Sequence, residues 1–468
     1  MRVYNVEDIV ANLLLVENFV TLVNVQVLAD QEVAFGINKM QLKKVLETAP
    51  FSILILKNIS NLAFMNLDIE IPTHKLAIKL KQKAEKLIRS GHPWIFENSI
   101  VKQSKEGNPG DLCIIFDNKK NKFLACGLYD PYSPIRIKVL QLLKPDTIDS
   151  TWFQNKIENA YAKRSQLLQT DTNSYRLIFG ENDGLPGLIA DVYDDVTVVK
   201  LYSHIWFPYL KWVLPQLLKV SKTDTMVIRL SRSVQNTPNA LDVKDGDIIF
   251  GQLKNEVVVF KEHGVLFSAN VIKGHKTGYF LDHRHNRKLV GEMSKHKSVL
   301  DVFSYAGGFS VHALVGGAES VTSLDISKQA LEMAVDNANL NKYIGEHKIM
   351  AVDAFEGLQK LIDQNQKFDI VVIDPPSFAK RETEVSGALR SYEKLAKLGV
   401  QLVSKGGTLV LASCSSRVDA EQFFSVSEEG LTNSGYDYIV LNKTYHDTDH
   451  PIAFKEGAYL KCGYYQIK

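Results

Sequence analysis

The stretch Val299-Leu-Asp-Val-Phe-Ser-Tyr-Ala-Gly-Gly-Phe-Ser310 decides the fold of this chain. Its pattern predicts a short buried strand that ends in a glycine-bearing turn and continues into a helix. Gly307 and Gly308 have no Cβ, so the backbone of the turn can approach a bound ligand closely. Open α/β sheets bind ligands at the carboxyl ends of their strands, which is where this turn would lie. The turn has neither the GxGxxG dinucleotide fingerprint nor the lysine of a P-loop, and by itself it also suits a ligand-free α/β turn.

The segments around this stretch alternate between strand and helix patterns. Strands are predicted at residues 298–303, 320–325, 368–374 and 407–413, and helices at residues 328–339 and 391–403. Strands that alternate with helices favour a doubly wound, mainly parallel sheet. Residues 263–468 are therefore predicted to form a Rossmann-like α/β domain.

Acidic residues recur where these strands end. Asp325 follows Asp301 by about 24 residues, a spacing at which a carboxylate can accept both ribose hydroxyls of a nucleoside. Asp353, which follows the apolar run at residues 349–352, stands where the adenine amino group would be recognised, and Asp374 closes the strand predicted at residues 368–374. The series predicts a site for S-adenosylmethionine (SAM), the cofactor of class I methyltransferases.

Asp374-Pro-Pro-Ser-Phe378 also bears on the substrate. Pro375 and Pro376 stiffen the turn and remove backbone donors, so that a base edge can meet the Asp374 carboxylate. A flipped-out nucleobase, read on its Watson–Crick edge and stacked on an aromatic ring, suits this arrangement. Phe378 is the candidate for stacking, and core packing is the alternative for that ring.

Cys414 follows the last predicted strand, so its thiol would face the same crevice as Asp374. Carbon 5 of a pyrimidine becomes nucleophilic when a thiolate adds to carbon 6, and β-elimination later releases the enzyme. An acid near N3 of the ring stabilises the adduct, a role open to Asp374. This chemistry requires a lowered thiol pKa. A buried cysteine is otherwise a small hydrophobe, the interpretation kept for Cys113, Cys126 and Cys462.

The N-terminal part is organised differently. Residues 1–70 carry no chemical motif, whereas residues 75–105 hold eight Lys or Arg against two Glu. Short apolar runs at residues 112–116, 123–129 and 135–140 then predict a small, all-β barrel-like module over residues 75–148. A helix at residues 151–168 and strands at residues 196–201, 225–230 and 256–261 predict a mixed α/β segment over residues 149–262.

Composition limits the protein class. The 468 residues include four cysteines without metal-ligand spacing, which indicates reduced thiols in a cytoplasmic protein and no metal site. There is no apolar run of about 18 residues that would suit a membrane span. A signal peptide is not expected either, because the N-terminal apolar stretches are interrupted by polar residues.

Six motifs together resemble one family. They are Gly91-His-Pro-Trp-Ile-Phe96, Glu181-Asn-Asp-Gly-Leu-Pro-Gly-Leu188, Lys276-Thr-Gly-Tyr-Phe-Leu-Asp-His-Arg284, Phe303-Ser-Tyr-Ala-Gly-Gly-Phe309, Asp374-Pro-Pro-Ser-Phe378 and Ser413-Cys-Ser415. From about Lys75 onward, over four-fifths of its length, the chain resembles the bacterial 23S rRNA cytosine-5 methyltransferases. These join an N-terminal PUA domain to a class I SAM domain. Residues 1–70 have no counterpart in the family, and Met65 stands shortly before the usual family start; residues 1–64 are expected to be either translated upstream sequence or a folded extension.

The resemblance implies a role for each part of the chain. The basic module would be a PUA domain that binds RNA, with 23S rRNA as partner, and residues 149–262 would be the linking domain. Cys414 matches the catalytic cysteine of the family. The second cysteine that many RNA cytosine-5 methyltransferases carry in the Asp-Pro-Pro-like loop is absent, which leaves the acceptor of the carbon-5 proton open. A homodimer is one assembly to be tested. The predicted RNA-binding residues are Lys79, Lys81, Arg89, His92 and Trp94, and the predicted SAM-binding residues are Tyr279, Asp282, Arg284, Asp301, Phe303, Ser304, Gly307, Gly308, Asp325, Ile326, Asp353, Ala354 and Asp374.

Two other functions fit the same motifs. Asp-Pro-Pro-aromatic loops also serve methyl transfer to the exocyclic amine of a purine, without a thiol nucleophile. An RNA-binding assembly factor with a vestigial cofactor site is the non-enzymatic alternative.

Overall fold

A computed structural model describes residues 70–237 and 242–468 of the chain. The expectations for residues 1–64, and for nearly all of residues 1–70, therefore lie outside the described residues. No helix in the described part of the chain is long and apolar enough to cross a membrane.

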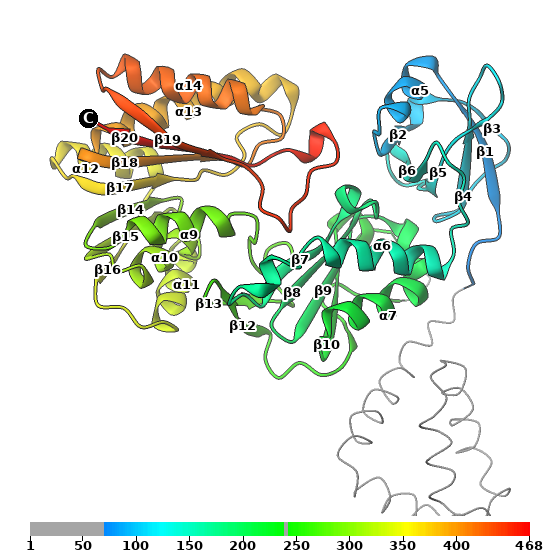
Figure 1. Cartoon of the computed structure of the whole chain (residues 1–468), viewed down its shortest axis with the longest axis horizontal. Helices are drawn as coiled ribbons and strands as arrows, with labels where there is room; N and C mark the ends of the chain where they lie inside the picture. Colours follow the sequence, from blue (N-terminus) through cyan, green and yellow to red (C-terminus); the bar gives the residue numbers. More distant parts are fainter. Residues whose placement is uncertain (1–69, 238–241) are drawn as a thin grey trace, which may run out of the picture. The chain divides into compact units, whose positions relative to one another are not determined.

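The C-terminal part is built on a seven-stranded sheet (Figure 1). The sheet order is β16-β15-β14-β17-β18-β20-β19, with the first five strands parallel and β20 antiparallel to both of its neighbours. The strands are β14 (Ser298–Val302), β15 (Ser320–Asp325), β16 (Glu346–Ala351), β17 (Phe368–Ile373), β18 (Val403–Ser413), β19 (Tyr438–Thr444) and β20 (Lys461–Ile467). The order reverses between β14 and β17, and such a switch point opens a ligand crevice at the carboxyl ends of the strands.

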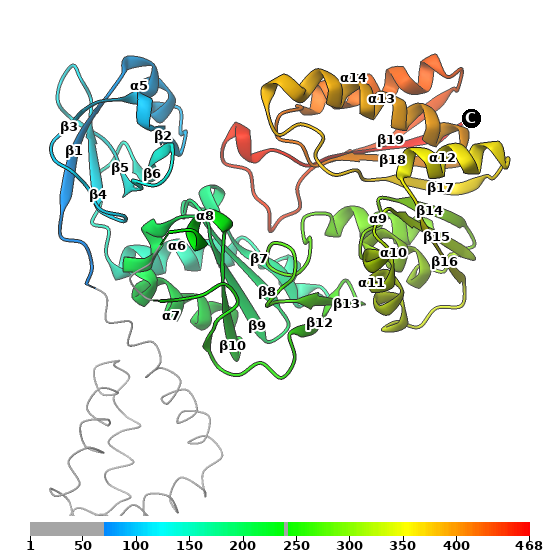
Figure 2. The same cartoon turned by 180° about the vertical axis from the view of Figure 1, so that it is seen from behind.

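Helices cover both faces of this sheet, as the two opposite views in Figures 1 and 2 show. Successive side chains of a strand point to opposite faces, so Val299 joins one hydrophobic core and Leu300 the other. One core includes residues of α9 (Arg284–Met293), α10 (Gly308–Val315) and α11 (Lys328–Asn339), and the other includes residues of α12 (Ala354–Asp363), α13 (Val385–Gln401) and α14 (Ala420–Asn433). The predicted doubly wound fold is confirmed.

Helix α13 begins six residues before its predicted start at residue 391. The carboxylate of Glu384 accepts hydrogen bonds from the backbone N–H groups of Lys380 and Arg381, which closes a short 3₁₀ turn just before the helix. This local turn directs the chain into the helix earlier than the apolar pattern indicated.

The middle part contains a five-stranded sheet of order β11-β10-β9-β8-β7 and a separate β12–β13 hairpin. Its elements are α6 (Ser150–Ala162), β7 (Ser174–Phe179), β8 (Leu188–Tyr193), β9 (Val196–Leu201), α7 (Leu210–Ser221), β10 (Thr225–Leu230), α8 (Arg232–Gln235), β11 (Ile248–Phe250), β12 (Val257–Glu262) and β13 (Val265–Asn270). Helix α6 ends six residues before the predicted residue 168. The buried Arg164 guanidinium donates to the Ala160 carbonyl at 2.9 Å and pairs with Asp183, which fixes the helix end.

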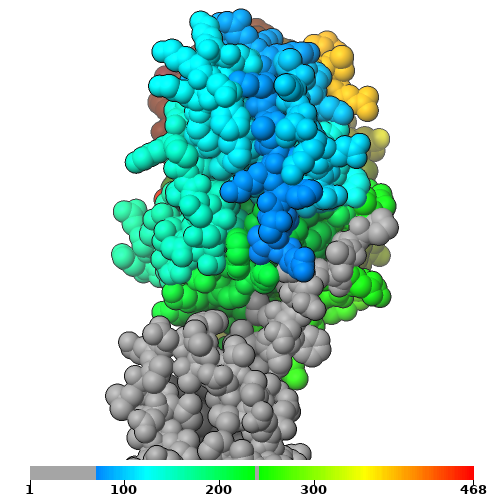
Figure 3. Space-filling model, turned by 90° about the vertical axis from the view of Figure 1, so that its right-hand side faces the viewer, coloured from blue at the N-terminus to red at the C-terminus, as the bar shows by residue number. Residues whose placement is uncertain are grey.

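The N-terminal module is a six-stranded sheet of order β2-β6-β5-β4-β1-β3 with one helix. Its elements are β1 (Lys75–Leu80), α5 (Gln82–Arg89), β2 (Trp94–Phe96), β3 (Ile100–Gln103), β4 (Leu112–Phe116), β5 (Phe123–Tyr129) and β6 (Ile135–Leu142). The prediction of an all-β module was wrong about α5, because the lysine-rich run was interpreted only as charge. Ala84 and Ile88, four residues apart, face the core while the lysines face solvent. The blue and cyan atoms of this module form much of the surface in Figure 3.

Candidate active site

The loop from β14 to α10 has an unusual backbone. The φ angles of Phe303, Tyr305 and Gly307 are 63°, 47° and 76°. Residues other than glycine rarely adopt this left-handed region. The Ser304 N–H donates to the Leu324 carbonyl at 3.1 Å, and the Tyr305 N–H donates to Asp325 Oδ2 at 3.0 Å. The neighbouring strand β15 thus holds a strained loop in place, and strain of this kind is concentrated at functional sites.

Both glycines of the turn are surrounded closely by protein atoms. A Cβ at Gly307 would lie 2.7 Å from the Ala334 Cβ. At Gly308 it would lie 2.8 Å from Arg287 Cδ and 3.0 Å from the Tyr279 hydroxyl. The turn therefore requires glycine for its internal packing as well as for the approach of a ligand.

Three buried polar atoms in this region have no hydrogen-bond partner: Asp301 Oδ1, Ser304 Oγ and the Tyr279 hydroxyl. The other carboxylate oxygen of Asp301 accepts from the Ser310 N–H at 3.0 Å and from the Ser310 hydroxyl at 2.6 Å. Burial raises the pKa of Asp301 to about 7; Ser310 opposes the rise, whereas Asp374 and Asp325 add to it. Unpaired buried polar atoms are costly, so a polar ligand with a positive charge fits this cluster.

Asp325 and Asp353 both bind backbone. Asp325 accepts from the Tyr305 and Ser327 N–H groups at 3.0 and 2.8 Å. Asp353 caps α12 by accepting from the N–H groups of Phe355 and Glu356. The predicted neighbours of these acids differ in exposure, since Ile326 is 73% exposed and Ala354 is buried.

The segment before α9 supplies Asp282, His283 and Arg284. Asp282 Oδ2 accepts from the Tyr459 hydroxyl at 2.8 Å, and His283 Nε2 lies 3.4 Å from Asp374 Oδ1. Burial opposes protonation of His283, but the carboxylates of Asp374 and Asp282 outweigh it and raise its pKa. Arg284 is fully buried and pairs with Asp447 and Asp449 at 3.0 and 2.7 Å, so its guanidinium is engaged inside the protein.

Cys414 lies one residue beyond β18, and its Sγ is 3.8 Å from the Pro375 carbonyl oxygen. It is the partly exposed member of the four cysteines, all of which lie among the described residues. Burial raises the pKa of Cys414 to about 12; Asp374 and Asp282 add to the rise, while Lys276 and Lys461 oppose it. The sequence-based requirement for a lowered thiol pKa is therefore not met by the protein without bound ligands.

The Asp-Pro-Pro loop contacts the Cys414 thiol through the backbone carbonyl of Pro375. Pro375 is buried and Pro376 is exposed. The ring of Phe378 packs against Tyr392 with centroids 5.3 Å apart, and it is only partly buried. Phe378 therefore contacts the core and retains an exposed edge.

Two residues of this centre were missed by the motif analysis. Tyr459 binds Asp282, and Lys461 lies beside the Cys414 turn. Both belong to the segment that leads from β19 into β20, which carries no recognisable motif. A lysine among the buried residues of β20 was the one available signal.

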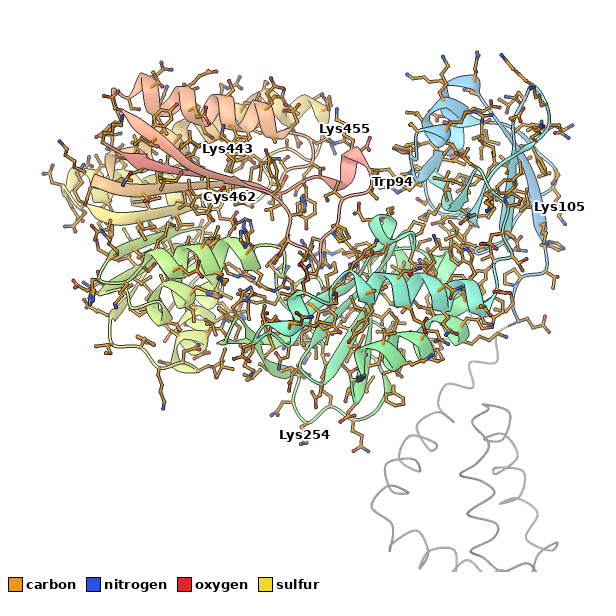
Figure 4. All side chains as sticks on the ribbon, in the orientation of Figure 1. Trp94, Lys105, Lys254, Lys443, Lys455 and Cys462 are labelled. Carbon is orange, nitrogen blue, oxygen red and sulfur yellow. The ribbon has the colours of Figure 1, made fainter. Side chains whose placement is uncertain are left out.

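The predicted RNA-binding residues fall into two groups. Lys81 and Arg89 are exposed, whereas Lys79 donates to the Asp117 carbonyl at 2.7 Å. Trp94 is engaged within the chain, since its indole N–H donates to Glu181 Oε1 at 2.9 Å and its ring packs on Phe454. Figure 4 shows Trp94 beside the segment that carries Lys455. The His92 ring accepts from the Trp94 N–H at 3.2 Å.

Comparison with known proteins agrees with this geometry. Residues 249–431 match the family of S-adenosylmethionine-dependent methyltransferases, and residues 78–142 match the PUA-like domain. A ribosomal RNA large subunit methyltransferase of Deinococcus radiodurans is 41% identical over 399 residues, which cover 84% of this chain and 98% of that protein. The chain belongs to this methyltransferase family. Ribosomal RNA large subunit methyltransferase I of Aliivibrio fischeri, another member, is 35% identical over 390 residues, covering 82% of this chain and 98% of its own length.

Solved structures support the fold of the family. A Streptococcus mutans chain assigned as a SAM-dependent methyltransferase matches with a TM-score of 0.69 at 20% identity, covering 83% of this chain and 99% of its own. A second assigned methyltransferase, complexed with SAH, matches with a TM-score of 0.70 at 22% identity, covering 84% and 99%. The predictions of a PUA-like module, a class I methyltransferase fold and SAM as cofactor are confirmed.

Proposed function

We propose that the protein methylates carbon 5 of a cytosine in 23S rRNA through a covalent adduct with Cys414. Its relatives are named as ribosomal RNA large subunit methyltransferases, which supports a large-subunit ribosomal RNA as substrate. The position of Cys414 carries the choice of cytosine, because its sulfur lies 3.8 Å from the Pro375 carbonyl in the loop proposed to hold the base. Methyl transfer to an exocyclic amine needs no thiol at this position.

The described residues divide the work of this reaction. The Cys414 sulfur forms a bond to carbon 6, which makes carbon 5 nucleophilic enough to take the methyl group. A base then takes the carbon-5 proton, which restores the 5,6 double bond and breaks the carbon–sulfur bond, and its electron pair returns to the Cys414 thiolate. His283 Nε2 and Asp374 Oδ1 lie 3.4 Å apart. We propose that this pair holds a proton near N3 of the ring.

Bound SAM supplies the methyl group on a positively charged sulfonium. We assign Asp301, Ser304 and Tyr279 to its polar groups, because each has a buried atom without a partner. The turn is shaped by Gly307, Gly308 and the Phe303 backbone. The nucleoside part of SAM is proposed to contact Asp325, Ile326, Asp353 and Ala354. Asp282 stays a proposed site residue through Tyr459, whereas the ion pairs of Arg284 favour a structural role.

We assign residues 75–148 to RNA binding, 149–262 to the linking domain and 263–468 to methyl transfer. Among the proposed RNA contacts, Lys81 and Arg89 are exposed and suit phosphate binding, which is weakened by salt. Lys79, His92 and Trp94 have partners inside the chain, so their contribution would be to shape the module. Among the described residues no cluster of side chains suits a metal ion.

Replacement of Cys414 by alanine tests the proposal. C414A should lose methyl transfer to a 23S rRNA fragment by at least about a thousandfold, while its affinity for SAM, measured by calorimetry, stays unchanged. Cys113→Ala is the matched control, since that thiol is buried in the N-terminal module. Mass spectrometry of the nucleosides identifies the product. Full activity of C414A, with a methylated exocyclic amine, would replace the cytosine proposal with the purine alternative.

A further inference from the structure

Lys461 occupies an unusual place for a lysine. It is the first residue of β20, pairs in register with Ser413 of β18, and is only 2% exposed. Its ammonium donates to the carbonyls of Ser415 and Val418, each at 2.5 Å, and to the Tyr459 carbonyl at 3.1 Å. The turn that follows Cys414 is thus tied to the neighbouring strand through one side chain.

No carboxylate lies within ion-pair distance of this ammonium among residues 70–237 and 242–468. Burial of an ammonium without a counterion lowers the stability of the folded protein. An uncharged donor could also satisfy the three carbonyls. Burial lowers the pKa of Lys461 to about 8, whereas Cys414 and, beyond ion-pair distance, the Asp419 carboxylate raise it. The effect is mutual, since burial, Asp374 and Asp282 raise the pKa of Cys414, whereas Lys276 and Lys461 lower it.

We propose that Lys461 is a positioning residue for the nucleophile: it fixes residues 415–418 behind Cys414 and holds a positive charge that stabilises the thiolate. The thiolate rather than the thiol attacks, so a fixed cation beside it increases the reactive fraction at neutral pH. The inference rests on the proposed function only in taking Cys414 as the nucleophile. The observations that support it are the three hydrogen bonds to carbonyls and the position of Lys461 opposite Ser413.

The reactivity of the thiol itself provides the test. The full chain is treated with iodoacetamide between pH 6 and 7.5, where Lys461 holds its proton, and alkylation of the Cys414 peptide is followed by mass spectrometry. Cys113, Cys126 and Cys462 are at most 1% exposed, so Cys414 should react first. Lys461→Met should shift the pH profile of alkylation upward by about one unit, equivalent to about a tenfold slower reaction at pH 7.

Three variants separate the charge from the packing. Lys461→Gln keeps donors for the carbonyls but has no charge, so it should show the same upward shift and replaces Lys461→Met if that variant does not fold. Lys461→Arg keeps the charge and should give the wild-type profile. Lys443→Met is the matched control, because Lys443 lies on the adjacent β19 and pairs with Glu428 at 2.6 Å.

The outcomes are distinct. Unshifted profiles for the uncharged variants, whether methyl transfer is kept or lost, would overturn the proposal, as would a shifted profile for Lys461→Arg. Failure of the proposed function gives another result, namely C414A that still methylates RNA. Since alkylation needs neither SAM nor RNA, the effect of Lys461 on the thiol can be measured in either case.

Discussion

The two sides of the switch point are built in different ways. On the cofactor side, the carboxyl ends of β14, β15 and β16, all the proposed polar groups except the Tyr279 hydroxyl come from residues 301–354, which are placed by loop backbone and a helix cap. On the thiol side, the carboxyl ends of β17 and β18, they come from four separate segments that include Asp282, Asp374, Cys414 and Lys461. The first side can form from local sequence, while the second requires most of the fold.

The largest expected effect comes from Asp449, which supports the thiol side from the segment between β19 and β20. Its carboxylate is fully buried and accepts from Arg284, from the Arg176 N–H at 2.9 Å and from His450 at 2.8 Å. Asp449→Asn should lower the free energy of unfolding by about 3 kcal/mol, because Arg284 loses a buried counterion. Urea denaturation measures this loss.

The exposed Lys288–Glu292 pair provides the control for this variant. Glu292→Gln should change stability by less than about 0.5 kcal/mol. If the two sides are independent, folded Asp449→Asn binds SAM within about twofold of wild type but methylates more slowly. An equal loss of SAM affinity would contradict that independence.

Asp301→Asn tests the cofactor side. Loss of a charged partner for the cofactor should weaken SAM binding by about 30-fold, measured by calorimetry, with Cys414 alkylation unchanged. The thermal stability of the variant should increase, although its affinity for SAM decreases. The pKa of Asp301 is raised by burial to about 7, so the folded carboxylate is destabilising above pH 7, and this effect disappears as the pH falls toward 4. The variant should therefore melt at a higher temperature than wild type at pH 8, and a lower melting temperature would contradict this account.

The pH dependence of SAM binding tests the contribution of the Asp301 charge directly. A carboxyl group with a pKa of about 7 is mostly protonated at pH 6 and mostly ionised at pH 8. Affinity for the cationic cofactor should rise about tenfold between these values. Asp301→Asn should remove most of this slope, and a slope that persists in the variant would assign the titration to another group.

Tyr279→Phe should have the smallest effect. The Tyr279 hydroxyl is buried and has no partner in the protein, so its removal costs no internal hydrogen bond. SAM affinity should fall about fivefold without a loss of thermal stability. Lower stability with unchanged affinity would show that the hydroxyl serves the protein rather than the cofactor.

The same contrast explains what the sequence could predict. Asp325 and Asp374 were placed correctly at strand ends because strand periodicity and proline are local signals. The Arg287–Glu262–His312 cluster, with contacts of 2.6 to 2.9 Å, could not be predicted, because it joins β12 to two helices far along the chain. Tyr459 and Lys461 were missed for the same reason, since their partners Asp282 and Ser415 lie 177 and 46 residues away along the chain.

The insertion of β20 between β18 and β19 has a consequence for biosynthesis. β19 leaves the ribosome before the strand that joins it to the sheet, so neither it nor the open edge of β18 has its final neighbour at that time. Cys414 lies at the end of that edge, and the turn that follows it gains its contacts with the Lys461 ammonium only when β20 has been translated. The order of synthesis thus delays a competent thiol until the scaffold around it, including the SAM side, has been translated.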